Sequence, residues 1–328
     1  MIVLGAGMAG LLAAAILRSS ASYVLEKQTS IPNNHSAVLR FRTEAVAQVL
    51  GIEFKAVDAM KAIHSWSNPL ADALAYSTKT TGSPTLRSIL TADNKLSRRY
   101  IAPTDLIAQL VLSVTCPIHL GRAATPEILL GHGASCPAVI STLPMPIMMA
   151  LLQWPKAEAA VPLFRWADGY NISFRMQGLD AYASLYVPDP DLEENRISLT
   201  GDRVTIETSC PSMDKVLFDH IVGEYETDVN SAMLRVERAM ELLGLHGTNM
   251  FGRVSDISVH RQRYAKILPV DEAVRREFIM WATKEHSIYS LGRYATWRPG
   301  LLLDDLVNDV RVIQRISRSP SSSYQYSK

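Results

Sequence analysis

The stretch Met1-Ile2-Val3-Leu4-Gly5-Ala6-Gly7-Met8-Ala9-Gly10 opens the chain and decides the fold of its first part. The apolar residues before Gly5 predict a short β-strand, and the apolar run Leu11–Leu17 predicts a helix directly after the glycines. Gly5 permits a tight turn, Gly7 lets the backbone approach a pyrophosphate, and Gly10 lets the helix pack closely on the strand. The start of such a helix presents unpaired N–H groups and a positive dipole end to phosphates.

An acidic residue ends the second predicted strand. Glu26 follows the short segment Ser22–Leu25 and lies 21 residues after Gly5. In dinucleotide-binding folds an acid at about this distance accepts hydrogen bonds from a ribose hydroxyl. Strand, glycines, helix, strand and acid together predict a bound dinucleotide. At this point NAD, NADP and FAD all remain open.

The bulk composition is that of an ordinary globular enzyme. The chain has 328 residues, of which 48% are hydrophobic and 20% charged, with a formal net charge of +1. This charge excludes a protein that coats nucleic acid with its whole surface, but it leaves room for a local basic site. The three cysteines, Cys116, Cys136 and Cys210, match no metal-binding spacing. We expect no metal site, no membrane segment and a cytoplasmic location.

The predicted elements divide the chain into two units that alternate in sequence, in an α/β fold. Strands at Asn171–Arg175, Ala183–Val187 and Val204–Thr208, separated by turn residues, indicate an antiparallel sheet. Helices are predicted at Thr43–Leu50, at Leu106–Val114 with Thr104 as its N-cap, at Asp228–Leu243 and at Leu302–Ile316. The expected nucleotide-binding domain comprises residues 1–50, 100–155 and 285–316. The expected substrate domain comprises 51–99 and 156–284, and residues 317–328 form a serine-rich tail that we expect to be disordered.

The C-terminal segment favours a flavin over a nicotinamide cofactor. No second glycine fingerprint is present, since Gly131 and Gly133 lack a third glycine at the required spacing. Tyr289–Trp297, which contains Gly292-Arg293, resembles the closing motif of FAD enzymes of the amine-oxidase and UDP-galactopyranose-mutase group. Val139–Pro144 is similar to the mid-chain strand of the same group. The resemblance covers about half of the chain.

The resemblance implies a Rossmann-like FAD-binding domain that is discontinuous in sequence, with an antiparallel sheet plus helices as substrate domain. It implies that the Gly-Arg pair meets the pyrophosphate and ribityl chain, and that the next helix points its N-terminus at the flavin. Arg40 and Arg42 are candidates to reach the flavin or its phosphates, although solvated strand ends explain them equally well. The predicted cofactor-binding residues are Gly5, Gly7, Ala9, Gly10, Glu26, Lys27, Arg40, Arg42, Thr142, Gly292, Arg293 and Leu303.

A closer resemblance narrows the expected reaction. The small size, together with Leu39–Arg42 and Gly292–Trp297, is similar to phage FAD-dependent lyases of thymidine hypermodification. This resemblance implies an amino-acid adduct on the 5-methyl carbon of thymine in DNA as substrate. A glycinyl adduct would be oxidised at its C–N bond, leaving 5-aminomethyl-deoxyuridine and glyoxylate. Modified DNA and molecular oxygen are the expected partners.

Candidate catalytic residues lie in the segment His260–Ile267. Strand alternation predicts His260, Gln262, Tyr264 and Lys266 on one face. Related amine oxidases often use a lysine that holds water near the flavin, which makes Lys266 the candidate here, beside the alternative of a solvated lysine. Tyr294 and Trp297 are candidates to stack on the flavin or on a flipped base, and core packing explains such aromatic residues equally well. The predicted catalytic residues are Lys266, Tyr264 and Trp297.

Other functions remain open on the sequence. A UDP-galactopyranose-mutase-like flavoenzyme would act without net redox change, and a small-molecule amine or amino-acid oxidase would not need DNA. A flavin-bound scaffold without turnover is the alternative from a different class. No G-x-S-x-G or comparable nucleophile motif occurs, which disfavours hydrolase chemistry.

Overall fold

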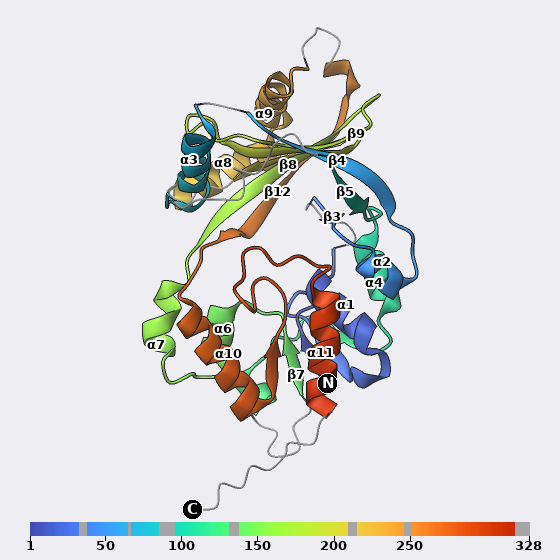
Figure 1. The fold of residues 1–328 in the computed structure, drawn as a ribbon, viewed down its shortest axis with the longest axis vertical. Helices are drawn as coiled ribbons and strands as arrows, with labels where there is room; N and C mark the ends of the chain where they lie inside the picture. The colour runs from blue at the N-terminus through green and yellow to red at the C-terminus, as the bar shows by residue number, and fades with distance from the viewer. Residues whose placement is uncertain are drawn as a thin grey trace, which may run out of the picture.

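The fold was taken from a computed structural model of the chain. The structure describes residues 1–32, 38–64, 67–84, 96–130, 138–208, 215–245 and 251–318. Gly131, Gly133, Cys136 and Cys210 lie outside these residues, as does the part of the expected tail from 319 onward. Two sheets lie one above the other, and segments from both ends of the chain meet in the lower half (Figure 1).

The lower half is built on a five-stranded sheet whose strand pairs are all parallel, in the order β13-β7-β1-β2-β6. Its strands are β1 (Ile2–Leu4), β2 (Tyr23–Leu25), β6 (Ile118–His119), β7 (Val139–Ser141) and β13 (Ile288–Ser290). The predicted α/β fold with a parallel sheet is therefore confirmed. The middle strand β1 is apolar along its whole length because both faces of the sheet are covered.

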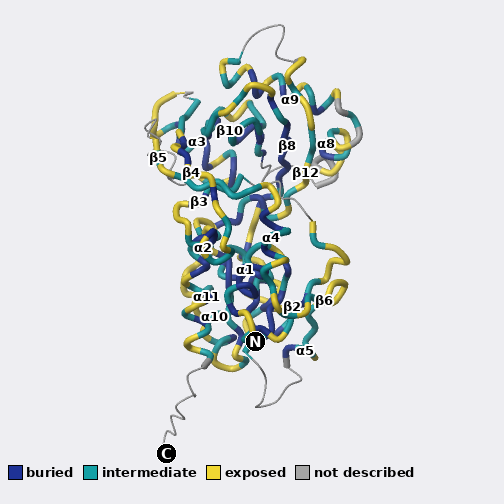
Figure 2. Tube along the Cα trace, turned by 90° about the vertical axis from the view of Figure 1, so that its right-hand side faces the viewer, coloured by how far each residue is buried: buried dark blue, intermediate teal, exposed yellow. Residues whose placement is uncertain are grey.

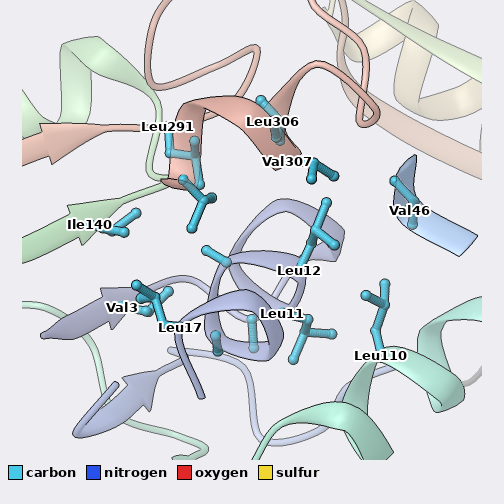
Figure 3. Packing of buried hydrophobic residues seen from close by; sticks show 14 of the residues in the cluster. Val3, Leu11, Leu12, Leu17, Val46, Leu110, Ile140, Leu291, Leu306 and Val307 are labelled. Carbon is cyan, nitrogen blue, oxygen red and sulfur yellow. The ribbon is translucent and has the colours of Figure 1, made fainter. Parts of the chain in front are cut away.

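Alternate residues of β1 belong to two different cores. Val3 packs with α1 (Met8–Leu17), α4 (Leu106–Ser113) and α11 (Leu306–Arg318), as Figure 3 shows around Leu12. Ile2 and Leu4 pack on the other face, against α6 (Met145–Leu151) and α10 (Glu272–His286). This is the two-residue period of a strand with a core on each side. Three further helices of the described residues complete this half: α2 (Ala45–Leu50), α5 (Pro126–Leu130) and α7 (Ala157–Ala160).

The upper half is an eight-stranded sheet in the order β12-β8-β11-β10-β9-β4-β5-β3. Neighbouring strands are antiparallel except for the parallel pair β4 and β9, which agrees with the expected antiparallel substrate sheet. The strands are β3 (Arg40–Phe41), β4 (Lys55–Ile63), β5 (Leu96–Ile101), β8 (Trp166–Met176), β9 (Ala181–Tyr186), β10 (Glu194–Gly201), β11 (Arg203–Thr208) and β12 (Val254–Ile267).

The two faces of the upper sheet differ in chemistry. One face is apolar and packs against α8 (Lys215–Thr227) and α9 (Val229–Leu242). The opposite face carries polar side chains, and α3 (Pro69–Thr81) packs over part of it through the Tyr76–Tyr186 ring contact. Figure 2 shows buried stretches in both halves of the molecule, so each sheet supports a core of its own.

Several predicted boundaries were wrong in detail. Thr104 does not cap α4, because the residue at the N-cap position is Asp105 and its side chain makes no capping hydrogen bond. Helix α11 begins at Leu306 rather than Leu302, and it continues through Arg318, so the first two residues of the expected disordered tail are helical. The prediction of α9 was close, since Asp228 accepts hydrogen bonds from the backbone N–H groups of Asn230 and Ser231.

Among the described residues, no helix is both long enough and apolar enough to cross a membrane. In the same part of the chain, no group of three or more His, Cys, Asp or Glu side chains is arranged to hold a metal ion.

Candidate functional site

The glycine turn after β1 requires glycine at two of its three positions for packing alone. Gly5 has φ +92°, and a Cβ there would lie 2.5 Å from the Oγ1 atom of Thr142. A Cβ on Gly10 would lie 1.9 Å from the carbonyl oxygen of Gly5. A Cβ on Gly7 would meet nothing within 4 Å, so the turn leaves open space at this residue. Gly7 is the N-cap of α1, where a bound phosphate would approach the helix.

Glu26 is held at this turn by backbone hydrogen bonds. Its Oε2 atom accepts from the N–H of Ala6 at 2.7 Å, and its Oε1 atom accepts from the N–H of Gln28 at 2.9 Å. Both carboxylate oxygens therefore lie between the glycine turn and the end of β2, where a ribose would sit. Lys27 is exposed beside it.

Thr142 and Gly292 reach the same edge of the sheet from distant parts of the chain. The N–H and the hydroxyl of Thr142 both donate to the carbonyl of Leu4, at 3.0 and 2.7 Å. Gly292 follows β13 with φ +90°, and a Cβ there would lie 3.3 Å from the Cβ of Ala9 on α1. The structure thus brings together predicted residues from the beginning, middle and end of the sequence.

The loop before α11 joins the site through an aspartate that the sequence analysis missed. The Oδ2 atom of Asp304 accepts from the N–H of Arg42 at 2.9 Å, and the Arg42 guanidinium donates to Asp305 at 2.6 Å. The side chain of Asp304 is 3% exposed, and its Oδ1 atom has no hydrogen-bond partner among the described residues. Leu303 is half-buried against the core around α1. The sequence signal was an Asp-Asp pair just before a helix.

Arg293 ties the two halves of the molecule together. Its Nη2 atom donates to the carbonyl of Tyr264 at 3.2 Å and to the hydroxyl of Tyr294 at 2.7 Å. The guanidinium also lies 4.8 Å from the centre of the Tyr294 ring. Its hydrogen bonds within the described residues therefore lead to β12 of the upper sheet, and its predicted contact with the cofactor stays a prediction.

Arg40 lies on the upper sheet, apart from the glycine turn. Its Nη1 atom donates to the hydroxyl of Ser184 at 2.9 Å, and Nη2 donates to the carbonyls of Ala183 and Leu199 at 2.7 and 2.5 Å. Its Nε atom is buried and has no partner among the described residues. Burial and, to a lesser extent, the nearby charge of Arg196 together lower the pKa of Arg40 to about 10. Among the described residues, no carboxylate pairs with this guanidinium within ion-pair distance.

The polar face of the upper sheet carries an excess of positive charge beside Arg40. Arg196 and Glu207 form a two-pronged ion pair across β10 and β11, in which Nη2 donates to Oε1 at 2.6 Å. Burial raises the pKa of the Glu207 carboxyl, but the charges of Arg196, Lys266 and Arg40 outweigh burial and hold it below its ordinary value. The positive charges of these three residues all act on the Glu207 carboxylate, which is an electrostatic setting that favours an anionic ligand.

Tyr264 interrupts β12, and the predicted strict alternation of this strand was wrong. The pairing with β8 shifts register between Gln262 and Lys266, and Tyr264 has φ +58°. The irregularity is held in place because the Tyr264 N–H donates to Asp168 at 3.2 Å and its carbonyl accepts from Arg293. A left-handed backbone at a bulky residue costs free energy, and such strain often marks a functional site.

Trp297 occupies a different environment from the other two catalytic candidates. It is 1% exposed, its indole N–H donates to the carbonyl of Leu268 at 2.8 Å, and its ring lies edge-on to Phe164. These are the contacts of a core residue. Tyr264 and Lys266 are half-buried on the upper sheet. The Tyr264 ring lies edge-on to the Trp297 ring, with 6.3 Å between the ring centres, so these two candidates are neighbours.

A cavity of about 790 Å³ lies beside the start of α11. Its lining includes Arg42, Arg275, Arg298 and Asp304, together with Trp297. None of the fingerprint glycines is among its lining residues. The cavity therefore extends the α11 end of the candidate site rather than the phosphate end.

This chain is similar to known proteins in structure but not in sequence. No protein-family model matches the sequence, and no curated protein matches it. An oxidoreductase from Methanosarcina mazei has a similar structure, with a TM-score of 0.56 at 11% identity over 96% of this chain and 99% of that one. A fatty acid isomerase from P. acnes, which produces CLA, also has a TM-score of 0.56, at 12% identity over 96% of this chain and 97% of its own.

A third similar structure is the PF1083 protein from Pyrococcus furiosus. It has a TM-score of 0.55 at 12% identity and is matched over 99% of both chains. Because the matches cover both chains almost completely, the arrangement of a parallel sheet below and a second sheet above is shared as a whole. At this level of identity the likeness establishes the fold of the chain.

Proposed function

We propose that this protein is an FAD-dependent oxidoreductase whose dinucleotide lies along the carboxyl edge of the parallel sheet. The observation that carries the proposal is the meeting of Gly5–Gly10, Glu26, Thr142 and Gly292 at this edge. The open space at Gly7 and the acid at the end of β2 fit the pyrophosphate and a ribose. The start of α11 lies close to the same edge. The positive end of its helix dipole fits the flavin half of the dinucleotide, beyond the pyrophosphate.

The fold neighbours agree with this class without defining the reaction. The Methanosarcina mazei protein is described as an oxidoreductase, whereas the P. acnes protein is an isomerase. One fold of this kind therefore hosts more than one chemistry, and the reaction must be argued from the site.

For the substrate, we propose a carboxylate-bearing amine, and specifically the glycinyl adduct of thymine in DNA that the sequence resemblance implies. Arg40 and the net positive charge around Glu207 supply what such a carboxylate requires. In the overall reaction the glycinyl α-carbon loses a hydride and the amine nitrogen a proton, giving an imine. Water adds to the imine carbon and the C–N bond breaks, which yields glyoxylate and the 5-aminomethyl base. Bound FAD would supply the hydride acceptor, and oxygen would take the two electrons and two protons as peroxide.

The residues of this chain then have separate tasks. Arg40 holds the substrate carboxylate, and Lys266, which stands near Glu207, holds at its Nζ atom the water that attacks the imine carbon. Tyr264, fixed through Asp168 and Arg293, forms part of the wall beside the reacting amine. Trp297 acts from the core by fixing the loop after Gly292.

The direct test uses the purified protein and a defined oligonucleotide. We expect the protein to show the two visible absorption bands of oxidised flavin. Incubation in air with a DNA strand that contains glycinyl-thymine should yield 5-aminomethyl-deoxyuridine on digestion and mass spectrometry, with one glyoxylate per product. A colourless protein that takes up no FAD would contradict the cofactor proposal. A yellow protein that turns over UDP-galactopyranose only with dithionite would contradict the oxidase reaction.

Replacing Arg40 with methionine tests the carboxylate assignment. We expect kcat/KM for a glycinyl substrate to fall about a hundredfold, because a charge-assisted hydrogen bond is lost from a partly buried site. The matched substrate is the glycinamide adduct, which has no carboxylate and should be used equally by both proteins. Steady-state oxygen consumption measures both. An equal loss on the amide would show that Arg40 supports the fold rather than the substrate.

A further inference from the structure

A group of aromatic rings lies where the upper sheet meets the loop after β13. The Trp166 and Tyr264 rings are 4.7 Å apart, and the Tyr294 ring lies 5.6 Å from Tyr264. Trp166 is 37% exposed, which is unusual for the largest apolar side chain. Figure 1 shows β8 and β12, which carry Trp166 and Tyr264, descending side by side toward the lower half.

Arginines accompany these rings at the surface. The guanidinium of Arg263 lies 5.3 Å from the centre of the Tyr264 ring, and Arg165 precedes Trp166 in the chain. Both arginines are exposed, and neither forms an ion pair with a carboxylate among the described residues. Arg261, two residues before Arg263, is by contrast paired with Asp219.

An exposed tryptophan beside half-buried tyrosines, accompanied by exposed arginines without an ion pair among the described residues, is an arrangement that binds a single nucleic-acid strand. The rings stack on bases of any sequence, and the guanidinium groups take the phosphates. The backbone of Tyr264 is held in a left-handed conformation by Asp168 and Arg293, which fixes the ring rather than leaving it to adapt.

We propose that Trp166, Tyr264 and Arg263 form a stacking platform for an unpaired base of single-stranded DNA next to the modified thymine. This inference rests on the proposed function, because it names the surface by which a DNA-linked substrate is held. Tyr264 and Arg263 lie on the same strand as Lys266, and Trp166 lies on the neighbouring strand β8. A DNA strand bound there would run beside the polar face that carries Arg40.

Fluorescence anisotropy with a labelled 12-nucleotide oligo(dT), unmodified, tests the platform without any turnover. We expect Trp166→Leu to raise Kd about tenfold and Trp166→Phe, which keeps an aromatic face, to raise it less than about threefold. Arg263→Gln should raise Kd about threefold and reduce the slope of log Kd against log salt by about 0.7. Arg261→Gln removes the same charge from the same strand and should leave Kd within a factor of about two.

The outcomes separate this inference from the proposed function. If Trp166→Leu and Arg263→Gln bind oligo(dT) as tightly as the wild type, the platform is wrong, even where the flavin reaction proceeds on a modified nucleoside. If both variants bind weakly while the flavin is inert to every glycinyl substrate, the platform stands and the reaction is wrong. Tighter binding of duplex than of oligo(dT) would also overturn the platform. Circular dichroism melts check that each variant is folded. If Trp166→Leu is unstable, the comparison of Arg263→Gln with Arg261→Gln tests the stacking platform instead.

Discussion

Replacing Gly10 with alanine should destabilise the fold, whereas replacing Gly7 with alanine should leave the fold intact and abolish dinucleotide binding. A Cβ on Gly10 would lie 1.9 Å from the backbone carbonyl of Gly5, so helix α1 would have to move away from the parallel sheet. We expect this to cost about 3 kcal/mol or more and to lower Tm by more than about 5 °C.

Gly7 differs because no atom of the described residues excludes a side chain there, and we expect only the bound dinucleotide to require glycine at this position. Its φ of −68° and ψ of 171° are open to alanine, and a Cβ there would meet nothing within 4 Å. The added methyl group would stand where the backbone must approach the pyrophosphate. We therefore expect Tm of the protein without ligand to change by less than about 2 °C, and Kd for FAD to rise at least about a hundredfold.

Differential scanning fluorimetry and flavin-fluorescence titration measure the two variants side by side. A Gly7→Ala protein that binds FAD like the wild type would place the dinucleotide elsewhere. A Gly10→Ala protein that melts like the wild type would show that α1 can shift without cost, against the close packing found here.

The parallel sheet was predictable because its determinants are local. Strand β1, the glycines, α1 and Glu26 lie within the first 26 residues, and Gly5 and Gly10 each have a distinct steric reason. That Gly292 would join them was predicted from resemblance, since no local pattern links residues so far apart. No strand was predicted at β10, because Glu194 and Arg196 interrupt its apolar pattern. Arg196 meets Glu207 only on β11, and Glu194 meets Arg235 only on α9.

The polar face of the upper sheet could not be predicted for the same reason. Arg196 and Glu207 become a pair only when β10 and β11 adopt their register, and Arg40 reaches β9 and β10 from a strand at the far end of the sheet order. Alternation along β12 failed at Tyr264 because a register shift depends on the neighbouring strand, not on the sequence of β12 itself.

The Arg196–Glu207 pair should contribute more to stability than the surface ion pairs of the described residues, and replacing Glu207 with glutamine tests this. The Glu207 side chain is 16% exposed and that of Arg196 26%, so the change leaves a largely buried arginine without its carboxylate. We expect a loss of about 3 kcal/mol in the free energy of unfolding at pH 7. The matched control is Glu277→Gln, which removes an exposed carboxylate paired with the exposed Lys156 and should leave the urea midpoint nearly unchanged.

The difference in unfolding free energy between the wild type and Glu207→Gln should depend on pH in a defined direction. Because the cations hold the pKa of Glu207 below its ordinary value in the folded protein, its contribution is fully present above the ordinary glutamate pKa, about 4.3. It is lost as the pH falls through the lower folded-state pKa, where the carboxyl becomes protonated and neutral like the glutamine. The gap in unfolding free energy between wild type and Glu207→Gln should therefore stay constant from about pH 7 to 5.5 and narrow below about pH 4.3. Urea denaturation followed by tryptophan fluorescence across this range measures it. A gap that widens in acid would mean that the Glu207 carboxyl is protonated in the folded state, and that Arg196 is balanced by another group.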